Sequence, residues 1–165
     1  MNKFEKISFA EFIKHFDPID WTQEEIKEIY ENIKLPCRST SGSAGYDFFS
    51  PVKIGIGAGA SIIVPTGIRC FLDEDKVLQV YPRSGLGFKF HMGLANTVGI
   101  IDSDYVNSDN EGHIMIKIVN NGNKILEIER NKAFAQGIVT QYFTVENDNE
   151  TEKQMRNGGF GSTNV

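Results

Sequence analysis

The chain has 165 residues and a mass of 18.5 kDa, the size of one compact domain and too small for two independent enzyme domains. Hydrophobic residues make up 40% of the sequence, an ordinary share that excludes wholesale disorder. Seventeen Lys and Arg against 22 Asp and Glu give a net charge of −5, the wrong sign for a general binder of duplex DNA. We therefore expect no direct nucleic-acid partner, and any phosphate-bearing ligand must meet a local basic cluster or a metal.

The sequence carries no pattern typical of export or of a membrane span. No apolar run approaches the roughly 20 residues that a membrane span needs, and residues 1–12 alternate charged and apolar side chains, unlike a signal peptide. We expect a cytoplasmic protein with no membrane partner.

The cysteines and histidines stand in unrelated contexts. Cys37 and Cys70 form no Cys-x-x-Cys pair and have no histidine at metal-binding spacing, so we expect two free, buried thiols. His15, His91 and His113 have no serine or cysteine motif nearby, and we expect surface or structural roles for them rather than general-base catalysis.

Residues 1–34 have a helical pattern. Ser8–Glu11 and Thr22–Glu25 are capping-box sequences, and each precedes apolar residues at helical spacing. The sequence predicts two short amphipathic helices, broken at Pro18, that form a helical N-terminal extension. Simple packing against the rest of the chain is the expected role, and bracing an oligomer or docking a partner are the alternatives.

At residue 35 the hydrophobic period changes from 3.6 to 2, and from there to residue 145 Gly and Pro separate short apolar runs. The alternation of Ile114, Ile116 and Ile118 with Met115 and Lys117 is the clearest case. Such spacing, without long helices between the runs, predicts an all-β, antiparallel barrel or sandwich. The expected strands are Val52–Ile56, Ser61–Val64, Ile68–Leu72, Val77–Tyr81, His113–Val119, Ile125–Ile128 and Ile138–Phe143.

Residues 146–165 differ again in composition. A polar, charged stretch runs from Glu146 to Lys153, and the glycine-rich stretch Gly158–Thr163 follows. We expect a flexible linker and a mobile C-terminal arm. Its glycines let it close over a ligand, Arg156 suits a phosphate and Phe160 suits a base. A plain disordered tail is the alternative.

Common nucleotide and metal motifs are missing from the sequence. It has no G-x-x-x-x-G-K-[ST], no G-x-G-x-x-G and no H-E-x-x-H. Residues 102–107 open like a calcium loop, but Val106 and Asn107 stand where a fifth ligand and a glycine are required, which excludes an EF-hand. The remaining candidates are short blocks rich in Gly, Asp, Arg and Ser.

The block Tyr81–Gly87 runs from a strand into an expected turn. Arg83, the Ser84 hydroxyl and backbone N–H groups at Gly85 converge there, which suits a phosphate oxygen. By itself, the block is equally typical of a plain surface turn.

The block Asn96–Tyr105 is the most informative. We expect an apolar strand that delivers Asp102 and Asp104 at i and i+2, on one face, just before Tyr105. A carboxylate placed there suits activation of a water, and the Tyr ring suits packing on a sugar. Turn capping and core packing are the alternatives. Asp47, at another strand edge, suits a hydrated Mg²⁺ beside phosphates, or is a simple turn residue.

Taken together and in order, these blocks resemble the conserved-motif series of the trimeric dUTPase (deoxyuridine triphosphatase) family, over Leu35 to Val165. The resemblance implies a jelly-roll-like β subunit and a homotrimer with active sites between subunits. It also implies Mg²⁺-dependent hydrolysis of dUTP to dUMP and pyrophosphate, which lowers dUTP and supplies dUMP for thymidylate synthesis. The matching blocks are Ala44–Asp47, Pro82–Leu86, Gly99–Tyr105, Ala135–Gly137 and Arg156–Thr163.

The resemblance also implies a role for each matching residue. Asp102 is the expected catalytic carboxylate that activates the attacking water, Tyr105 packs on deoxyribose and excludes a 2′-hydroxyl, and Asp47 reaches Mg²⁺ through water. The other expected substrate-binding residues are Asn96, Gly99, Ile100, Ile101 and Met115 around the base, Arg83, Ser84, Gly85 and Gln136 at the phosphates, and Arg156, Phe160, Gly161 and Ser162 from a neighbouring subunit.

Three departures from the family pattern stand out. Val106–Asn110 is inserted after the tyrosine, Ala133 stands where the family commonly has an arginine that Arg130 would have to replace, and residues 1–34 lie outside the resemblance. Two other functions stay open: the related dCTP deaminase activity, and a dUTP-responsive regulator with an unknown protein partner.

Overall fold

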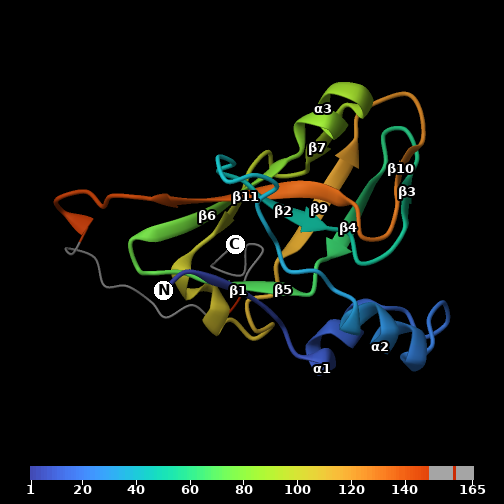
Figure 1. Ribbon diagram of the computed structural model, residues 1–165, viewed down its shortest axis with the longest axis horizontal. Coiled ribbons are helices and arrows are strands. Elements are labelled where there is room, and N and C mark those ends of the chain that lie inside the picture. The colour runs from blue at the N-terminus through green and yellow to red at the C-terminus, as the bar shows by residue number, and fades with distance from the viewer. Residues whose placement is uncertain (149–157, 159–165) are drawn as a thin grey trace.

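In the computed structural model, which describes residues 1–148 and residue 158, antiparallel strands form the body of the molecule (Figure 1). The strands are β1 (Lys3–Lys6), β2 (Tyr46–Phe49), β3 (Ile54–Ile56), β4 (Ser61–Pro65), β5 (Ile68–Phe71), β6 (Lys76–Pro82), β7 (Met92–Leu94), β8 (Gly99–Ile101), β9 (Met115–Asn120), β10 (Leu126–Ile128) and β11 (Ala133–Gln141). The helices are α1 (Phe9–Phe12), α2 (Gln23–Glu31) and α3 (Ser84–Phe90), with the 3₁₀ helices η1 (Ile13–His15) and η2 (Ser103–Asn107).

Every strand pair among the described residues is antiparallel, which confirms the expected all-β, jelly-roll-like fold. One sheet has the order β2-β11-β6-β8 and another the order β4-β9-β7, while β1-β5 and β10-β3 form two-stranded ribbons. The alternation expected for β9 is present, because Ile116 and Ile118 are buried and Lys117 between them is exposed.

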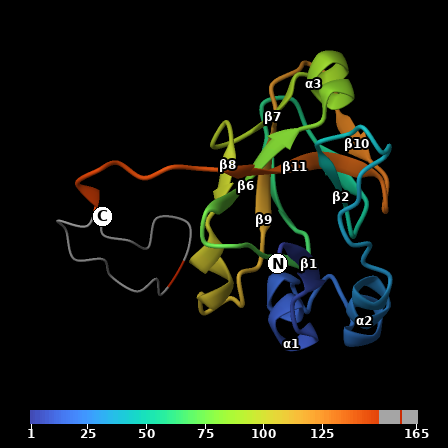
Figure 2. The same ribbon diagram turned by 60° about the vertical axis from the view of Figure 1, so that its left-hand side comes forward.

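The hydrophobic core joins the strands to the N-terminal segment. Phe48, Ile118 and Phe134 from the sheets belong to the same buried cluster as Phe12 and Ile29 from the helices. α1 and α2 lie together at one end of the molecule in both views (Figure 1, Figure 2). Residues 1–34 therefore pack onto the β body.

Gly67, between β4 and β5, allows the N-terminal segment to pack closely against the β body. Its φ of 71° is left-handed, and a Cβ at this position would lie 2.4 Å from Ile33 Cδ1 and 3.2 Å from the Phe12 ring. Glycine is the residue that tolerates both the backbone conformation and the contact.

The capping sequences begin the two expected N-terminal helices. The Ser8 side chain accepts a hydrogen bond from the Glu11 N–H, and Thr22 and Glu25 form a complete capping box. The extension is not helical throughout, however, because β1 pairs with β5 from Lys3 to Lys6. Four residues with one apolar side chain, Phe4, give too little periodicity for such a strand to be recognised.

Two other expectations are corrected. The block after β6 is the helix α3 and not a turn; two glycines and the absence of a side-chain hydrogen bond at its N-cap leave little helical signal in the sequence. Of the two thiols expected to be buried, Cys70 is buried but Cys37 is exposed.

Over residues 1–148, no helix has both the length and the apolar character that crossing a membrane requires. The expected mobile arm falls almost entirely on residues 149–157 and 159–165, which lie outside the described residues.

Candidate active site

A cavity of about 420 Å³ lies beside β8 and β9 and contains six of the predicted substrate-binding residues. Its walls are largely apolar, and Asn96 and Lys117 add polar groups. A mainly apolar pocket of this volume with a few polar groups is typical of small-molecule sites. The predicted residues that line it are Asn96, Gly99, Ile100, Ile101, Tyr105 and Met115.

β8 presents backbone groups to this cavity. It is the edge strand of its sheet, paired on one side with β6 and with no strand on its other side within the described residues. An edge strand has outward N–H and C=O groups that are free to bind a ligand. Gly99 sits close to β6, since a Cβ there would lie 3.1 Å from Val80 Cβ.

Tyr105, in η2, lines the cavity, and hydrogen bonds to its hydroxyl fix the position of its ring. The residue is 5% exposed. Its hydroxyl donates to the His113 carbonyl oxygen at 2.9 Å and accepts from Asn110 Nδ2 at 2.9 Å. The expected sugar-packing role and the core-packing alternative are thus both compatible with one buried ring.

The structure corrects the expected arrangement of the two acids. β8 ends at Ile101, Asp102 is the N-cap of η2, and Asp104 lies in the first turn of that helix. The two carboxylates therefore do not lie at i and i+2 on one strand face. Asp102 directly follows Ile101, the last residue of β8 that lines the cavity.

A second group of predicted residues meets where β2, β6 and β11 lie together. Arg83 Nε lies 3.1 Å from Asp47 Oδ1, and Gln136 Nε2 donates to the Pro82 carbonyl oxygen at 3.2 Å. Gly45 lies so close that a Cβ there would be 2.6 Å from Gln136 Oε1. Ser84 and Gly85 follow as the first residues of α3, at the end of a helix where backbone N–H groups have no helical partner.

Arg130, the proposed replacement for the missing arginine of the family pattern, is engaged elsewhere. Its Nη1 lies 2.9 Å from Glu28 Oε2, so this side chain ties the last strands to α2. Gln136 is held by the backbone of Pro82 instead.

The strand register separates the two groups within one chain. Because β6 and β8 are antiparallel, with Val80 opposite Gly99 and Leu78 opposite Ile101, the chain reaches Asp102 near the start of β6, whereas Arg83 follows its end. At 3.3 Å per residue, six residues of strand correspond to roughly 20 Å. α3 and the yellow segment that contains η2 lie at opposite ends of the molecule (Figure 1, Figure 2).

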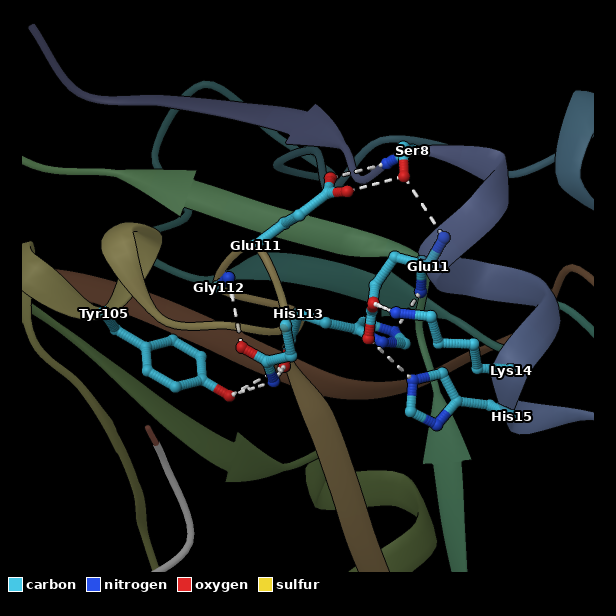
Figure 3. A network of polar contacts seen from close by, with 10 residues as sticks. Ser8, Glu11, Lys14, His15, Tyr105, Glu111, Gly112 and His113 are labelled. Atoms are coloured by element: carbon cyan, nitrogen blue, oxygen red, sulfur yellow. Dashed lines mark hydrogen bonds and ion pairs between the residues drawn. The ribbon is translucent and has the colours of Figure 1, made fainter. Parts of the chain in front are cut away.

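Glu11, His15 and His113 form a third cluster, which no motif in the sequence predicted, and their potential ligand atoms lie within 4.8 Å of one another (Figure 3). His113 Nε2 accepts a hydrogen bond from the Gly67 N–H at 2.9 Å. A neutral imidazole has one lone-pair nitrogen, so Nδ1 carries the proton and His113 cannot bind a metal in this arrangement. Only the i, i+4 spacing of Glu11 and His15 signalled part of this cluster.

His113 is held neutral by its surroundings. The side chain is fully buried, and burial, with a smaller contribution from His15, lowers its pKa to about 3. The expectation of a structural role for His113 agrees with its contact to Gly67.

Comparison with known proteins identifies the family. A family model described as dUTPase matches residues 31–164, which is most of the chain. The chain belongs to the dUTPase family.

The dUTPase relatives cover most of this chain and of their own length. Two that bear the name deoxyuridine 5′-triphosphate nucleotidohydrolase come from Lactococcus lactis subsp. lactis and Rickettsia felis. The first is 37% identical over 142 residues, or 84% of this chain and 95% of the relative. The second is 37% identical over 151 residues, or 87% of this chain and 98% of the relative.

Two solved dUTPase structures share the fold. That of Streptococcus mutans superposes with a TM-score of 0.67 at 32% identity, over 87% of this chain and 98% of that one. That of phage phi11 of S. aureus gives 0.65 at 19% identity, over 88% and 94%, and is described as coordinating a structural Mg(II) ion. The predicted residues Arg156, Phe160, Gly161 and Ser162 lie outside the described residues.

Proposed function

We propose that this chain hydrolyses dUTP to dUMP and pyrophosphate. The observation that carries the proposal is the cavity between β8, β9 and η2, with Asp102 directly after its last β8 residue. The names of the relatives support the same substrate. A cytoplasmic location belongs to the proposal, because a nucleoside triphosphate is an intracellular substrate.

In this proposal the cavity binds the deoxyuridine part of the substrate. Asn96 and the backbone of β8 read the uracil edge, since edge-strand N–H and C=O groups match the acceptors and donor of a pyrimidine. Met115 and the apolar walls pack on the base, and the Tyr105 ring packs on deoxyribose. Two hydrogen bonds hold this ring in place, so that a ring packed on the deoxyribose would exclude a 2′-hydroxyl.

Asp102 acts as the general base. It orients a water and takes its proton as that water attacks the α-phosphorus, with pyrophosphate as the leaving group. Its position at the N-cap of η2, beside the cavity, supports this role.

The phosphate-binding group, Arg83, Ser84, Gly85 and Gln136, has to come from another copy of the chain. Arg83 and Asp102 must approach the same phosphates, yet the register of β6 and β8 separates them by roughly 20 Å within one chain. A closed cyclic assembly solves this, because each site then takes Asp102 from one subunit and Arg83 from the next. We propose the homotrimer of the family, with Arg156, Phe160, Gly161 and Ser162 completing the site.

Mg²⁺ fits the donors at the phosphate-binding group. Asp47 offers a carboxylate beside Arg83, and Mg²⁺ prefers to keep several waters and to bind phosphate oxygens. We propose that Asp47 holds it through a water. Bound Mg²⁺ neutralises charge on the phosphates, and Arg83 adds the fork of donors that a phosphate favours.

The test is release of pyrophosphate by the purified protein with Mg²⁺, comparing dUTP with UTP, dTTP and dCTP and repeating each with EDTA. The proposal expects Mg²⁺-dependent release from dUTP alone. Ammonia release from dCTP would instead indicate the deaminase activity. Tight dUTP binding without turnover would indicate a nucleotide-responsive regulator.

A further inference from the structure

The Tyr105 hydroxyl is held by the chain's own insertion. The hydroxyl donates its one proton to the His113 carbonyl oxygen. In its contact with Asn110 Nδ2, 2.9 Å away, it is therefore the acceptor. Asn110 belongs to the inserted segment Val106–Asn110. Of the two groups that fix the far end of the ring, the His113 carbonyl and the Asn110 amide, the amide therefore comes from a residue that the family pattern does not supply.

Asn110 is itself fixed in orientation. Its Oδ1 accepts from the Gly112 N–H at 3.2 Å, which keeps Nδ2 directed at Tyr105. Gly112 has a φ of 74°, and a Cβ there would lie 2.6 Å from Val106 Cα. The turn therefore folds tightly against η2, and Glu111 within it also has a left-handed φ of 58°.

The N-terminal segment braces this turn (Figure 3). Glu111 accepts from the Ser8 N–H at 2.8 Å and from the Ser8 hydroxyl at 2.5 Å. The same Ser8 oxygen accepts from the Glu11 N–H and begins α1. Arg69 Nη1, 3.8 Å from the Glu111 carboxylate, adds a positive charge.

We propose that Asn110 is a positioning residue for sugar selection, which holds the Tyr105 ring against the deoxyribose, and that Ser8 of the N-terminal segment braces the turn of Asn110 through Glu111. This rests on the proposed function. A uridine nucleotide differs from a deoxyuridine nucleotide by one oxygen, so the ring discriminates only if it cannot move aside. Admitting a 2′-hydroxyl then requires that the hydroxyl contacts of Tyr105 be broken.

The test compares Asn110→Ala with wild type in kcat/KM for dUTP and for UTP. Loss of the partly buried hydrogen bond from Asn110 to the Tyr105 hydroxyl should lower the dUTP/UTP ratio about five- to tenfold. The change should come mainly from faster UTP turnover, with kcat for dUTP little altered. Asn107→Ala is the matched control, because Asn107 is an exposed residue of the same type in the same insertion.

A double-mutant cycle separates positioning from a general loss of structure. Tyr105→Phe removes the hydroxyl, so adding Asn110→Ala to it should change the dUTP/UTP ratio less than twofold. An unchanged ratio in Asn110→Ala, an equal fall for both nucleotides, or the full effect in the Tyr105→Phe background would overturn the inference. Wild-type protein without dUTP turnover would overturn the proposed function, and this inference with it.

Discussion

At the scale of the residue, Asp102 is the side chain on which the proposed chemistry depends. It begins η2 directly after the edge strand that lines the cavity. Replacing its carboxylate with the amide of asparagine would keep the shape of the side chain, but the amide could not take the proton of the attacking water. This substitution thus separates the contribution of Asp102 to turnover from any contribution to shape.

Asp102→Asn should keep dUTP binding within a few-fold of wild type and lower kcat by about 100-fold or more, because general-base catalysis contributes on that order. Calorimetric titration with dUTP and pyrophosphate release measure the two quantities. Asp109→Asn, an exposed carboxylate in the inserted segment, is the control and should retain wild-type turnover. Equal turnover in the Asp102→Asn variant would remove Asp102 from the mechanism.

His113 makes stability depend on pH. Its pKa in the folded protein is about 3, against an ordinary value of 6.5, because the side chain is buried. The unfolded chain therefore binds a proton that the folded chain does not, between these two values. The contribution of His113 to the free energy of unfolding is therefore full well above pH 6.5 and decreases as the pH falls, by about 2 kcal/mol at pH 5.

His113→Gln keeps a side-chain acceptor for the Gly67 N–H and removes the titration. Urea unfolding at pH 7 and pH 5 should show a loss of stability about 2 kcal/mol smaller in the variant than in wild type. His91→Gln, at the exposed C-cap of α3, is the control. Parallel losses in all three proteins would contradict a neutral, buried His113.

At the scale of the element, the contact between the N-terminal helices and the β4–β5 turn depends on Gly67. Gly67→Ala adds a methyl group that clashes with Ile33 and Phe12, in a backbone conformation that alanine disfavours. We expect a loss of about 2–4 kcal/mol of unfolding free energy. Gly55→Ala, with open space around the position and no positive φ, should stay within about 0.5 kcal/mol of wild type in the same urea titration.

The elements show what periodicity can and cannot predict. β9 was recognisable because Ile116 and Ile118 within it, and Ile114 just before it, alternate with Met115 and Lys117. The two N-terminal helices were recognisable because their caps are local. α3 was not, because Gly85 and Gly87 weaken its helical signal.

The candidate site likewise has parts that a local sequence pattern predicts and parts that it does not. Its residues were predicted from ordered short blocks, whereas the bond between Ser8 and Glu111 joins residues 103 positions apart and leaves no local pattern. The cluster of Glu11 with His113 could not be predicted from the sequence for the same reason.

At the scale of the whole molecule, the proposed site is shared between copies. Asp102→Asn and Arg83→Ala should each be inactive as homotrimers. Co-expressed, they should recover up to about a quarter of wild-type turnover per site, since a random mixture gives that fraction of sites an intact Asp102 and an intact Arg83 from different chains. Pyrophosphate release from the mixed, purified trimers measures this.

Co-expressing Asp102→Asn with wild-type protein should give a linear fall in turnover and serves as the control. No recovery in the mixture of the two inactive variants would place both residues in one chain's site and contradict the argument from the strand register.

The long-range pairing of this fold bears on how it is made. β2 pairs with β11 through Phe48 and Ala135, and β1 pairs with β5. Ser8 binds the carboxylate of Glu111, which lies 103 residues further along the chain. Such high contact order slows folding, because loop-closure entropy is lost before the pairing is gained. On the ribosome, the four-stranded sheet β2-β11-β6-β8 cannot form until β11 has left the exit tunnel. The strand edges of a nascent chain then stay open for most of synthesis, the interval in which a β protein is most exposed to aggregation.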